Sequence, residues 1–376
     1  MKVLLVSNYL HDRQESMLRF AAALAEGLRA DEVDVRVVRP EPVFGGLKPG
    51  GSGLGKWLGY LDKFLLFPAR LRRLAAMADL VHICDHSNAM YVPHIADRPH
   101  LITCNDMLAI RSARGEFPQN RTGWSGRILQ RWILQGLQQA RRLTCISEAT
   151  RRDVLRLGGH PAEMVSVTYM GQNFSYAPVS EIAQAAARRR RGGNVDTAIF
   201  TKYGLPAEPY ILHVGSGQWY KNRPAVVAMH SALRARLGVN TPRLLMVGPL
   251  YLAPGVETRS EVDNRALAAL YSGAELLLFP SLEEGFGWPI IEAQACGCRV
   301  LTTGKDPMTE VGGQAAFYLP DPTDIVAGAE AIDEILQQNE AVRTESIRAG
   351  IENAARFSTE RMIREYLAIY REVLDA

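Results

Sequence analysis

The sequence has no run of about eighteen apolar residues, the length that a membrane-spanning helix needs. Its formal net charge of +3 is too small to indicate a nucleic-acid-binding protein. The apolar run Met1–Val6 is too short for a signal peptide and predicts a buried strand. We therefore expect a globular protein of the cytoplasm that neither spans a membrane nor binds nucleic acid.

Cysteine is scarce as well, because the chain has only five, an odd number, mostly within apolar segments. This pattern favours buried, reduced thiols over disulfides. Cys296 and Cys298 are separated by one residue, whereas common zinc and redox motifs have two between their cysteines. The sequence therefore predicts no metal site and no disulfide framework.

The chain does have a substantial apolar fraction, 47% of 376 residues, which is enough for two domains of ordinary size. Short β-branched runs alternate with longer segments of helical periodicity. Such alternation indicates an α/β fold, in which parallel strands are joined by crossover helices on both faces of a sheet. The first series predicts a domain over residues 1–180, with strands at Val3–Ser7, Val33–Arg39, Leu80–Cys84, Pro99–Cys104 and Leu143–Ser147.

A basic segment separates this series from a second one. Residues 181–205 include four consecutive arginines followed by two glycines, which is typical of a solvated helix or linker, with an anion-binding site as the alternative. A second α/β domain is predicted over residues 206–355, and residues 356–376 are a last amphipathic helix that would pack back on the N-terminal domain. The strands of this second domain are expected at Tyr210–Val214, Leu244–Val247, Leu276–Phe279 and Arg299–Thr302. Ligands of such sheets bind at the carboxyl ends of the strands, so we expect the active site in a cleft between the domains.

The most specific pattern follows the strand that ends at Phe279. It reads Glu284-Gly285-Phe286-Gly287-Trp288-Pro289-Ile290-Ile291-Glu292. Pro289 falls where a helix would begin, a position that tolerates its missing N–H. The two glycines let backbone amides approach a ligand closely, and the helix N-terminus behind them favours an anion. Glu284 and Glu292 can thus face one cleft from opposite sides of a phosphate-sized gap.

This combination resembles the family-4 group of retaining glycosyltransferases, which have the GT-B fold of two Rossmann-like α/β domains facing across a cleft. The resemblance implies that Glu284 contacts the transferred sugar and that Glu292 binds the ribose of the nucleotide. The loop residues Gly285, Phe286 and Gly287 would bind the donor. Residues 206–355 would then form the nucleotide-sugar domain, and residues 1–180 the acceptor-side domain.

A second match begins the C-terminal domain. The family has a glycine after its first strand there, often followed by an arginine, and a lysine five residues further on; these cations neutralise the diphosphate. Gly215 and Lys221 match, but Ser216 stands where arginine is usual. The charge of the diphosphate would therefore be neutralised by Lys221, by loop amides and by a further cation. Tyr220 stands where a dinucleotide-binding fingerprint needs its third glycine, which disfavours a dehydrogenase.

The N-terminal half resembles the family less closely. In place of the usual Gly-Gly loop, the first strand is followed by a polar segment with Asn8, His11 and Arg13, which either contacts the acceptor or is a plain polar loop. Asp85 and His86, at the end of a later strand, are further acceptor candidates. His82, inside that strand, is predicted to be a packed histidine.

The family usually has His-Asp where this chain has Asn105-Asp106. An amide can hydrogen-bond a sugar hydroxyl but cannot carry a positive charge or shuttle a proton. Two interpretations stay open: a natural variant, or a substitution introduced to trap substrate. We keep Asn105 with Glu284 and Lys221 as a catalytic candidate.

The stretch from Lys56 to Arg73 mixes aromatic residues with cations. It either makes a peripheral contact with an anionic membrane, where a lipid-linked acceptor would lie, or forms a helix packed in the N-terminal domain with a basic outer face. In the first case the protein would work at the inner face of the membrane.

The resemblance implies a retaining hexosyltransferase that needs neither metal nor cofactor. The donor would be a UDP- or GDP-linked hexose and the acceptor a saccharide or a lipid-linked saccharide, in polysaccharide biosynthesis. The leaving diphosphate would itself take the proton of the acceptor. A non-catalytic or impaired nucleotide-sugar-binding protein of the same fold and a sugar-nucleotide epimerase are the alternatives.

Overall fold

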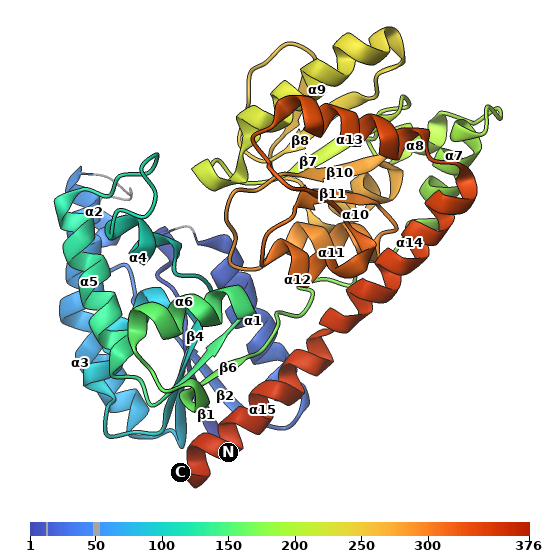
Figure 1. The fold of residues 1–376 in the computed structure, drawn as a ribbon. Coiled ribbons are helices and arrows are strands. Elements are labelled where there is room, and N and C mark those ends of the chain that lie inside the picture. Colours follow the sequence, from blue (N-terminus) through green and yellow to red (C-terminus); the bar gives the residue numbers. More distant parts are fainter. Residues whose placement is uncertain (13, 48–52) are drawn as a thin grey trace. The chain divides into compact units, whose positions relative to one another are not determined.

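The computed structural model describes residues 1–12, 14–47 and 53–376, which divide into two compact α/β units. The first unit comprises Met1–Asn173 and Thr359–Ala376, and the second comprises Phe174–Ser358 (Figure 1). Each unit contains a six-stranded sheet in which every strand pair is parallel. The two α/β domains predicted from the alternating pattern are therefore present.

The sheet of the first unit has the strand order β2-β1-β3-β4-β5-β6. The order reverses between β1 and β3, and in sheets of this kind ligands bind outside the carboxyl ends of the strands at that reversal. The strands are β1 (Lys2–Val6), β2 (Asp34–Val38), β3 (Leu80–Ile83), β4 (His100–Cys104), β5 (Arg142–Cys145) and β6 (Val165–Val167). The helices are α1 (Glu15–Ala30), α2 (Gly53–Leu61), α3 (Phe67–Ala75), α4 (Leu108–Ala113), α5 (Trp124–Gln138), α6 (Glu148–Gly158) and α15 (Thr359–Asp375), with shorter helices η1 (Leu10–Asp12), η2 (Gly45–Leu47), η3 (Asp62–Leu66), η4 (His86–His94) and η5 (Ala162–Met164).

The sheet of the second unit has the order β12-β11-β10-β7-β8-β9, which reverses between β10 and β7. Its strands are β7 (Tyr210–Val214), β8 (Arg243–Val247), β9 (Val256–Arg259), β10 (Leu276–Phe279), β11 (Val300–Thr303) and β12 (Phe317–Leu319). The helices are α7 (Ser180–Arg190), α8 (Ala198–Lys202), α9 (Arg223–Leu237), α10 (Asn264–Gly273), α11 (Trp288–Ala295), α12 (Met308–Gly312), α13 (Ile325–Gln337) and α14 (Glu340–Ala354), with η6 (Trp219–Lys221), η7 (Gly238–Asn240), η8 (Gly313–Ala315) and η9 (Ala355–Phe357).

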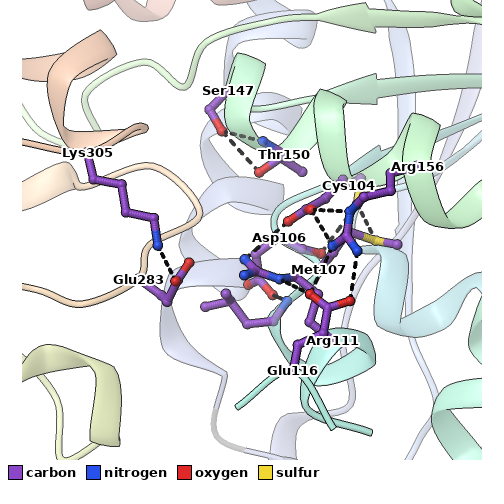
Figure 2. A network of polar contacts seen from close by, with 12 residues as sticks. Cys104, Asp106, Met107, Arg111, Glu116, Ser147, Thr150, Arg156, Glu283 and Lys305 are labelled. Atoms are coloured by element: carbon purple, nitrogen blue, oxygen red, sulfur yellow. Dashed lines mark hydrogen bonds and ion pairs between the residues drawn. The ribbon is translucent and has the colours of Figure 1, made fainter. Parts of the chain in front are cut away.

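Local sequence explains where several helices begin. The Ser147 hydroxyl, directly before α6, accepts a hydrogen bond from the Thr150 backbone N–H at 3.1 Å, and Figure 2 shows this cap. Asp263, Asp324 and Asn339 cap α10, α13 and α14 in the same way. Each side chain satisfies a backbone N–H that lacks a partner inside the helix, which stabilises the helix by about 1 kcal/mol.

The C-terminal helix α15 belongs to the first unit, where it packs against α1, β3 and β4. His82 is buried and lies between two hydroxyl groups: its Nδ1 is 2.7 Å from the Tyr370 hydroxyl and its Nε2 is 2.8 Å from Thr103 Oγ1. The Tyr366 hydroxyl lies 2.9 Å from the same Thr103 oxygen. His82 is thus a packed strand histidine, and two tyrosines join α15 to the sheet through buried hydrogen bonds.

Residues 181–205, for which the sequence predicts a linker, contain α7 and α8 and belong to the second unit. Helix α7 packs on α10 because it carries Ile182, Ala185 and Ala186 as a buried face. Its arginines are also engaged: Arg189 Nη2 lies 3.2 Å from a carboxylate oxygen of the buried Glu275, and Arg190 Nη1 lies 3.6 Å from it. Two of the four consecutive arginines are therefore held by a counter-charge inside the unit.

Candidate functional site

In the second unit, the side chains of Lys221 and Glu284 come together where the strand order reverses. Lys221 ends η6, shortly after β7, and Glu284 lies in the loop after β10, the adjacent strand. Lys221 Nζ is 2.6 Å from Glu284 Oε1, and the two side chains are only 13% and 7% exposed. The ammonium group also lies 5.0 Å from the centre of the Phe279 ring. Two residues chosen from distant motifs thus form one ion pair at the predicted ligand edge of the sheet.

Backbone contacts hold the two loops against each other. The Leu282 N–H donates to the Tyr220 carbonyl at 2.8 Å, and the side-chain amide of Asn222 donates to the Pro280 carbonyl at 3.0 Å and to the Pro322 carbonyl at 2.9 Å. Asn222 has a φ of 54°, a left-handed conformation that asparagine tolerates better than most residues. These bonds fix the position of the Lys221 ammonium relative to the loop that carries Glu284.

The loop after β10 ends in a helix that begins where the sequence predicts it. Gly287, directly before α11, has a φ of 109°, which side-chain-bearing residues rarely adopt. Pro289 lies in the first turn of α11. Phe286 is buried and its ring packs edge-on against Phe357, with 5.6 Å between ring centres. The Phe286 side chain therefore packs inside the second unit, and its predicted contact with the donor stays a prediction.

Glu292 lies inside α11 and is buried, with one carboxylate oxygen accepting a hydrogen bond from the Tyr271 hydroxyl at 3.0 Å. Burial, together with the neighbouring Glu292 carboxylate, raises the pKa of Tyr271 well above its ordinary value. Tyr271 thus stays a neutral donor that orients the carboxylate. Tyr271 is not among the site residues predicted from the sequence, because its partner is apparent only from the packing of α10 on α11.

Gly215 and Ser216 lie in the loop between β7 and η6. A Cβ atom on Gly215 would lie 2.9 Å from His213 Nε2, so this position needs glycine for close packing. His213 Nδ1 lies 2.9 Å from the Leu278 carbonyl oxygen, and burial lowers the pKa of His213 to about 4. Ser216 is exposed. His213 is therefore a neutral residue that joins β7 to β10 beneath the loop.

The structure shows two further cations near this loop, and both are engaged elsewhere. Arg223, two residues after Lys221, donates from Nη2 to the Pro249 carbonyl at 2.6 Å, and its guanidinium lies 4.9 Å from the centre of the Tyr251 ring. Lys305, which follows β11, forms an ion pair with Glu283, as Figure 2 shows. Neither residue takes the place that Ser216 leaves without an arginine, and the cation that pairs with Glu284 is Lys221.

In the first unit, four predicted residues meet at the reversal between β1 and β3. Asn8 follows β1, Asp85 and His86 follow β3, and Asn105 follows β4. The Asp85 carboxylate accepts a hydrogen bond from Asn8 Nδ2 at 2.6 Å and one from Asn105 Nδ2 at 3.1 Å, and His86 Nδ1 lies 3.1 Å from it. Ser87 also donates to it. We call Asn8, Asp85, His86, Ser87 and Asn105 the polar cluster.

In the polar cluster, Asp85 and His86 each stabilise the ionised form of the other. Burial raises the pKa of Asp85, but the contacts with His86, Ser87 and Asn8 outweigh it and hold that pKa well below its usual range. Burial likewise lowers the pKa of His86, but the Asp85 carboxylate outweighs it, and the net shift is upward. The cluster therefore favours an imidazolium next to a carboxylate.

Three side-chain atoms of the polar cluster are buried without a hydrogen-bond partner among the described residues, namely Asn8 Oδ1, Asn105 Oδ1 and His86 Nδ1. The two amide oxygens are acceptors, whereas His86 Nδ1 lies within ion-pair distance of Asp85, 3.1 Å from its Oδ1. Because a buried acceptor without a donor costs free energy, such atoms point to a ligand group that would donate to them. A sugar hydroxyl is a donor of that kind.

The remaining acceptor candidates lie outside this cluster. His11 lies in η1, with its ring 5.3 Å from that of Tyr9. Arg13 lies outside the described residues. In the same unit, Glu116 joins helices α4 and α6, because it accepts hydrogen bonds from Arg111 and Arg156, as Figure 2 shows. The hydrogen bonds from Arg156 hold the pKa of Glu116 below its usual range.

The described part of the chain has neither a cluster of metal ligands nor a helix that could span a membrane. Its His, Cys, Asp and Glu side chains form no group of three or more that could hold a metal ion. Within the same residues, no helix combines the length and apolar content that crossing a membrane requires.

Comparison with known proteins identifies both halves of the chain. Residues 208–338 match the family model described as glycosyl transferases group 1, and residues 17–175 match the model described as Glycosyltransferase Family 4. The chain is 24% identical over 339 residues to the O-antigen chain mannosyltransferase B of Escherichia coli, which covers 85% of this chain and 84% of that protein.

Solved structures show the same fold. Anabaena HepE in complex with UDP and glucose has a TM-score of 0.69 and 16% identity, covering 98% of this chain and 99% of that chain. Sucrose-phosphate synthase from Thermosynechococcus elongatus has a TM-score of 0.71 and 17% identity, with both chains covered completely, at 100% each. The predicted GT-B fold with two Rossmann-like domains is thereby confirmed. The chain belongs to the family-4 type of GT-B glycosyltransferases.

Proposed function

We propose that the protein is a retaining hexosyltransferase that moves a hexose from a UDP- or GDP-linked donor to a saccharide or lipid-linked saccharide acceptor in polysaccharide biosynthesis. The observation that carries the proposal is the ion pair of Lys221 and Glu284 at the reversal of the second sheet, 2.6 Å apart. An ammonium group and a carboxylate held side by side suit a donor that has both a diphosphate and a hydroxylated sugar.

The proposed donor contacts follow from this pair. Lys221 and the amides of the loop that contains Gly285 and Gly287 would bind the diphosphate, because backbone N–H groups at a helix N-terminus favour anions. Glu284 would accept hydrogen bonds from the sugar hydroxyls. Glu292, oriented by Tyr271, would accept them from the ribose hydroxyls.

In the proposed reaction, the bond between the anomeric carbon and the diphosphate oxygen breaks and the acceptor oxygen bonds to that carbon on the same face. The acceptor's proton passes to the leaving diphosphate oxygen. The protein then needs no nucleophile of its own, and its contribution is to stabilise charge and orient the reactants. Lys221 would stabilise the negative charge that grows on the diphosphate. We propose that this chemistry needs neither metal nor cofactor.

The comparisons support the substrate classes. The similar Escherichia coli protein is named as a mannosyltransferase of the O-antigen chain, which supports a hexose donor and a growing polysaccharide. The similar Anabaena structure contains UDP and glucose, which supports a UDP-linked hexose as the donor.

For the acceptor, we propose contacts with the polar cluster, because Asn8 Oδ1 and Asn105 Oδ1 would gain donors from saccharide hydroxyls. The imidazolium of His86 would supply a positive charge near the position where the family usually has histidine and this chain has Asn105. With a lipid-linked acceptor, the protein would work in the cytoplasm at the inner face of a membrane, in peripheral contact through the stretch Lys56–Arg73.

The test is a screen of UDP- and GDP-linked hexoses by thermal shift, followed by assays of nucleoside diphosphate release with and without a saccharide acceptor. We expect release that depends on the acceptor, and a product whose anomeric configuration, read by NMR, is that of the donor. EDTA should not change the rate. Binding of the donor without acceptor-dependent release would identify a non-catalytic binding protein, and an epimerised nucleotide sugar would identify an epimerase.

A further inference from the structure

Two helical segments of the first unit expose stripes of large apolar side chains. Trp57, Leu61 and Leu65 follow one another at four-residue spacing through α2 and the π-helical turn η3, and Trp124, Ile128 and Trp132 do the same along α5. Trp57 is 62% exposed, Leu65 65%, Trp124 76% and Ile128 61%. Residues four apart lie on one face of a helix, so each segment carries its own apolar stripe.

A chain of ring contacts joins the two stripes. The ring centres of Trp57 and Tyr60 are 5.6 Å apart, those of Tyr60 and Phe64 5.2 Å, and those of Phe64 and Trp132 5.0 Å. Figure 1 draws α2, α3 and α5 along one flank of the first unit. The stripes therefore form one continuous patch. We call it the aromatic surface: Trp57, Tyr60, Leu61, Phe64, Leu65, Trp124, Ile128 and Trp132.

The sequence around the aromatic surface is strongly cationic. Residues 117–147, which include α5, contain five arginines and no acidic residue. Residues 53–78, which include α2, η3 and α3, contain five lysines and arginines and one acidic residue, Asp62. The whole chain has 43 basic and 40 acidic residues, so the excess of positive charge is local.

The one carboxylate of these segments points away from solvent. Asp62 is 1% exposed and accepts hydrogen bonds from the Tyr9 hydroxyl and from the backbone N–H groups of Phe44 and Gly45, each at 2.9 Å. It therefore contributes no exposed negative charge.

Acidic residues from other segments neutralise only part of the excess. Lys63 forms an ion pair with Asp12, and Arg70 forms one with Glu41. By contrast, Arg127 and Arg131 are exposed and lie on α5 beside the stripe, and Arg121 is exposed just before that helix. The aromatic surface is therefore bordered by guanidinium groups along α5.

We propose that the aromatic surface binds an anionic lipid bilayer, with its tryptophans at the level of the headgroups and its arginines against their phosphates. Apolar helical stripes next to cations suit such a surface, and tryptophan favours the boundary between headgroups and acyl chains. The charge around the apolar patch is of one sign, which favours an anionic bilayer as the partner. A protein partner would need carboxylates at the edge of its interface opposite each of these arginines. This inference deepens the proposed function, since it places α5 beside the Lys56–Arg73 stretch at the membrane where a lipid-linked acceptor would lie.

Co-sedimentation with vesicles tests the proposal without donor or acceptor. The full chain is mixed with vesicles of phosphatidylcholine alone or with about one third phosphatidylglycerol. We expect binding to the anionic vesicles, a decrease on adding salt, and a blue shift of tryptophan fluorescence. The double variants Trp124→Ser/Ile128→Ser and Arg127→Gln/Arg131→Gln should each lower the bound fraction by about tenfold.

The pair Leu250→Ser/Leu252→Ser serves as the matched control, because both leucines are highly exposed in the second unit. It should bind as the wild type does. Equal binding to both vesicle types, or equal binding by the α5 variants and the control, would overturn the proposal. So would failure to bind vesicles together with a concentration-dependent dimer that Trp124→Ser/Ile128→Ser disrupts, since the occupant would then be a second copy. Transfer to a water-soluble saccharide, assayed without vesicles, tests the proposed function separately.

Discussion

The Lys221 ammonium lies 2.6 Å from a carboxylate oxygen of Glu284, although 62 residues separate them in the chain and they come from the loops of two adjacent strands. The pair occupies the reversal point of the second sheet, where ligands of such sheets bind. When a donor binds, its diphosphate would replace Glu284 as the partner of the Lys221 ammonium. The hydroxyls of its sugar would then donate hydrogen bonds to Glu284. The ion pair thus holds the two proposed ligand-binding groups in place before a ligand binds.

Replacing Lys221 by alanine should chiefly slow transfer. We expect kcat to fall by about 100- to 1000-fold, because the charge on the leaving diphosphate grows in the transition state and one fixed donor to such a charge is worth that much. Affinity for the nucleoside diphosphate should fall less. Lys305→Ala, which removes the nearby exposed lysine paired with Glu283, is the matched control and should leave kcat within a few-fold of wild type. Equal losses in the two variants would contradict a specific role for Lys221.

Replacing Glu292 by alanine should chiefly weaken nucleotide binding. The loss of a charged acceptor for the ribose hydroxyls is worth about 1.5–3 kcal/mol, or about 10- to 100-fold in Kd. Tyr271→Phe should have a smaller effect of the same kind, because the hydroxyl only orients the carboxylate from 3.0 Å. Calorimetric titration with UDP and GDP measures both variants. An unchanged Kd in Glu292→Ala would contradict the ribose role.

Asn105→His restores the residue that the family usually has, and it should leave transfer unchanged or lower it. Asn105 Nδ2 donates both to Asp85 Oδ1 at 3.1 Å and to the Cys84 carbonyl at 3.3 Å, and one imidazole N–H cannot serve both acceptors. The larger ring would also have to fit at a buried position. Initial rates with a saccharide acceptor measure the effect. A clear increase in rate would support the other interpretation, that asparagine was introduced to trap substrate.

The regular pattern of the sequence was enough to predict the fold. Strand β7 has the predicted bounds, and β10 does too, because both are short buried runs of apolar residues followed by loops. Strand β9 was not predicted: Val256–Arg259 has one apolar residue followed by three polar ones and is half-buried at the edge of the sheet, so it lacks the apolar run. Helix α7 was predicted as part of a linker, because the carboxylate that binds its arginines, Glu275, lies far away in the sequence.

Site residues that lie within a short sequence motif could be predicted, whereas residues that reach the site only through tertiary packing could not. Glu284, Lys221 and Glu292 follow from short motifs. Tyr271, which orients Glu292, becomes apparent only when α10 packs on α11. The sequence likewise gave no sign that the Asp85 carboxylate gathers Asn8 and Asn105, because side-chain hydrogen bonds between distant loops leave no periodicity to detect.

The stability of the second unit should depend on Glu275, which is buried among arginines. Its carboxylate lies 2.9 Å from Arg343 and 3.2 Å from Arg189, and its backbone carbonyl accepts a hydrogen bond from Arg299. Burial and the charge of Arg343 lower the pKa of Arg299 to about 10. Glu275→Gln leaves these cations without their counter-charge, so we expect a loss of about 3–5 kcal/mol, seen as a lower Tm. Glu345→Gln, which breaks an exposed ion pair on α14, should leave the Tm unchanged; similar shifts in both would contradict the argument.

The buried His82 should make the first unit sensitive to acid. Burial lowers its pKa to about 3, whereas the unfolded chain binds a proton near pH 6.5. Stability from this group is therefore present above pH 6.5 and is lost as the pH falls toward 3, at about 1.4 kcal/mol per pH unit.

Replacing His82 by glutamine, which can hydrogen-bond but does not titrate in this range, should reduce the loss between pH 6.5 and 5 by about 2 kcal/mol, measured by denaturant unfolding at each pH. Tyr370→Phe is the control. It removes the hydroxyl 2.7 Å from His82 Nδ1 and so should cost about 1–3 kcal/mol at both pH values, because the ring nitrogen is left buried without a partner. Since the histidine stays buried, the dependence on pH should persist. If His82→Gln kept the wild-type dependence as well, the acid sensitivity would have to come from other histidines, and the link between α15 and the sheet would not be its source.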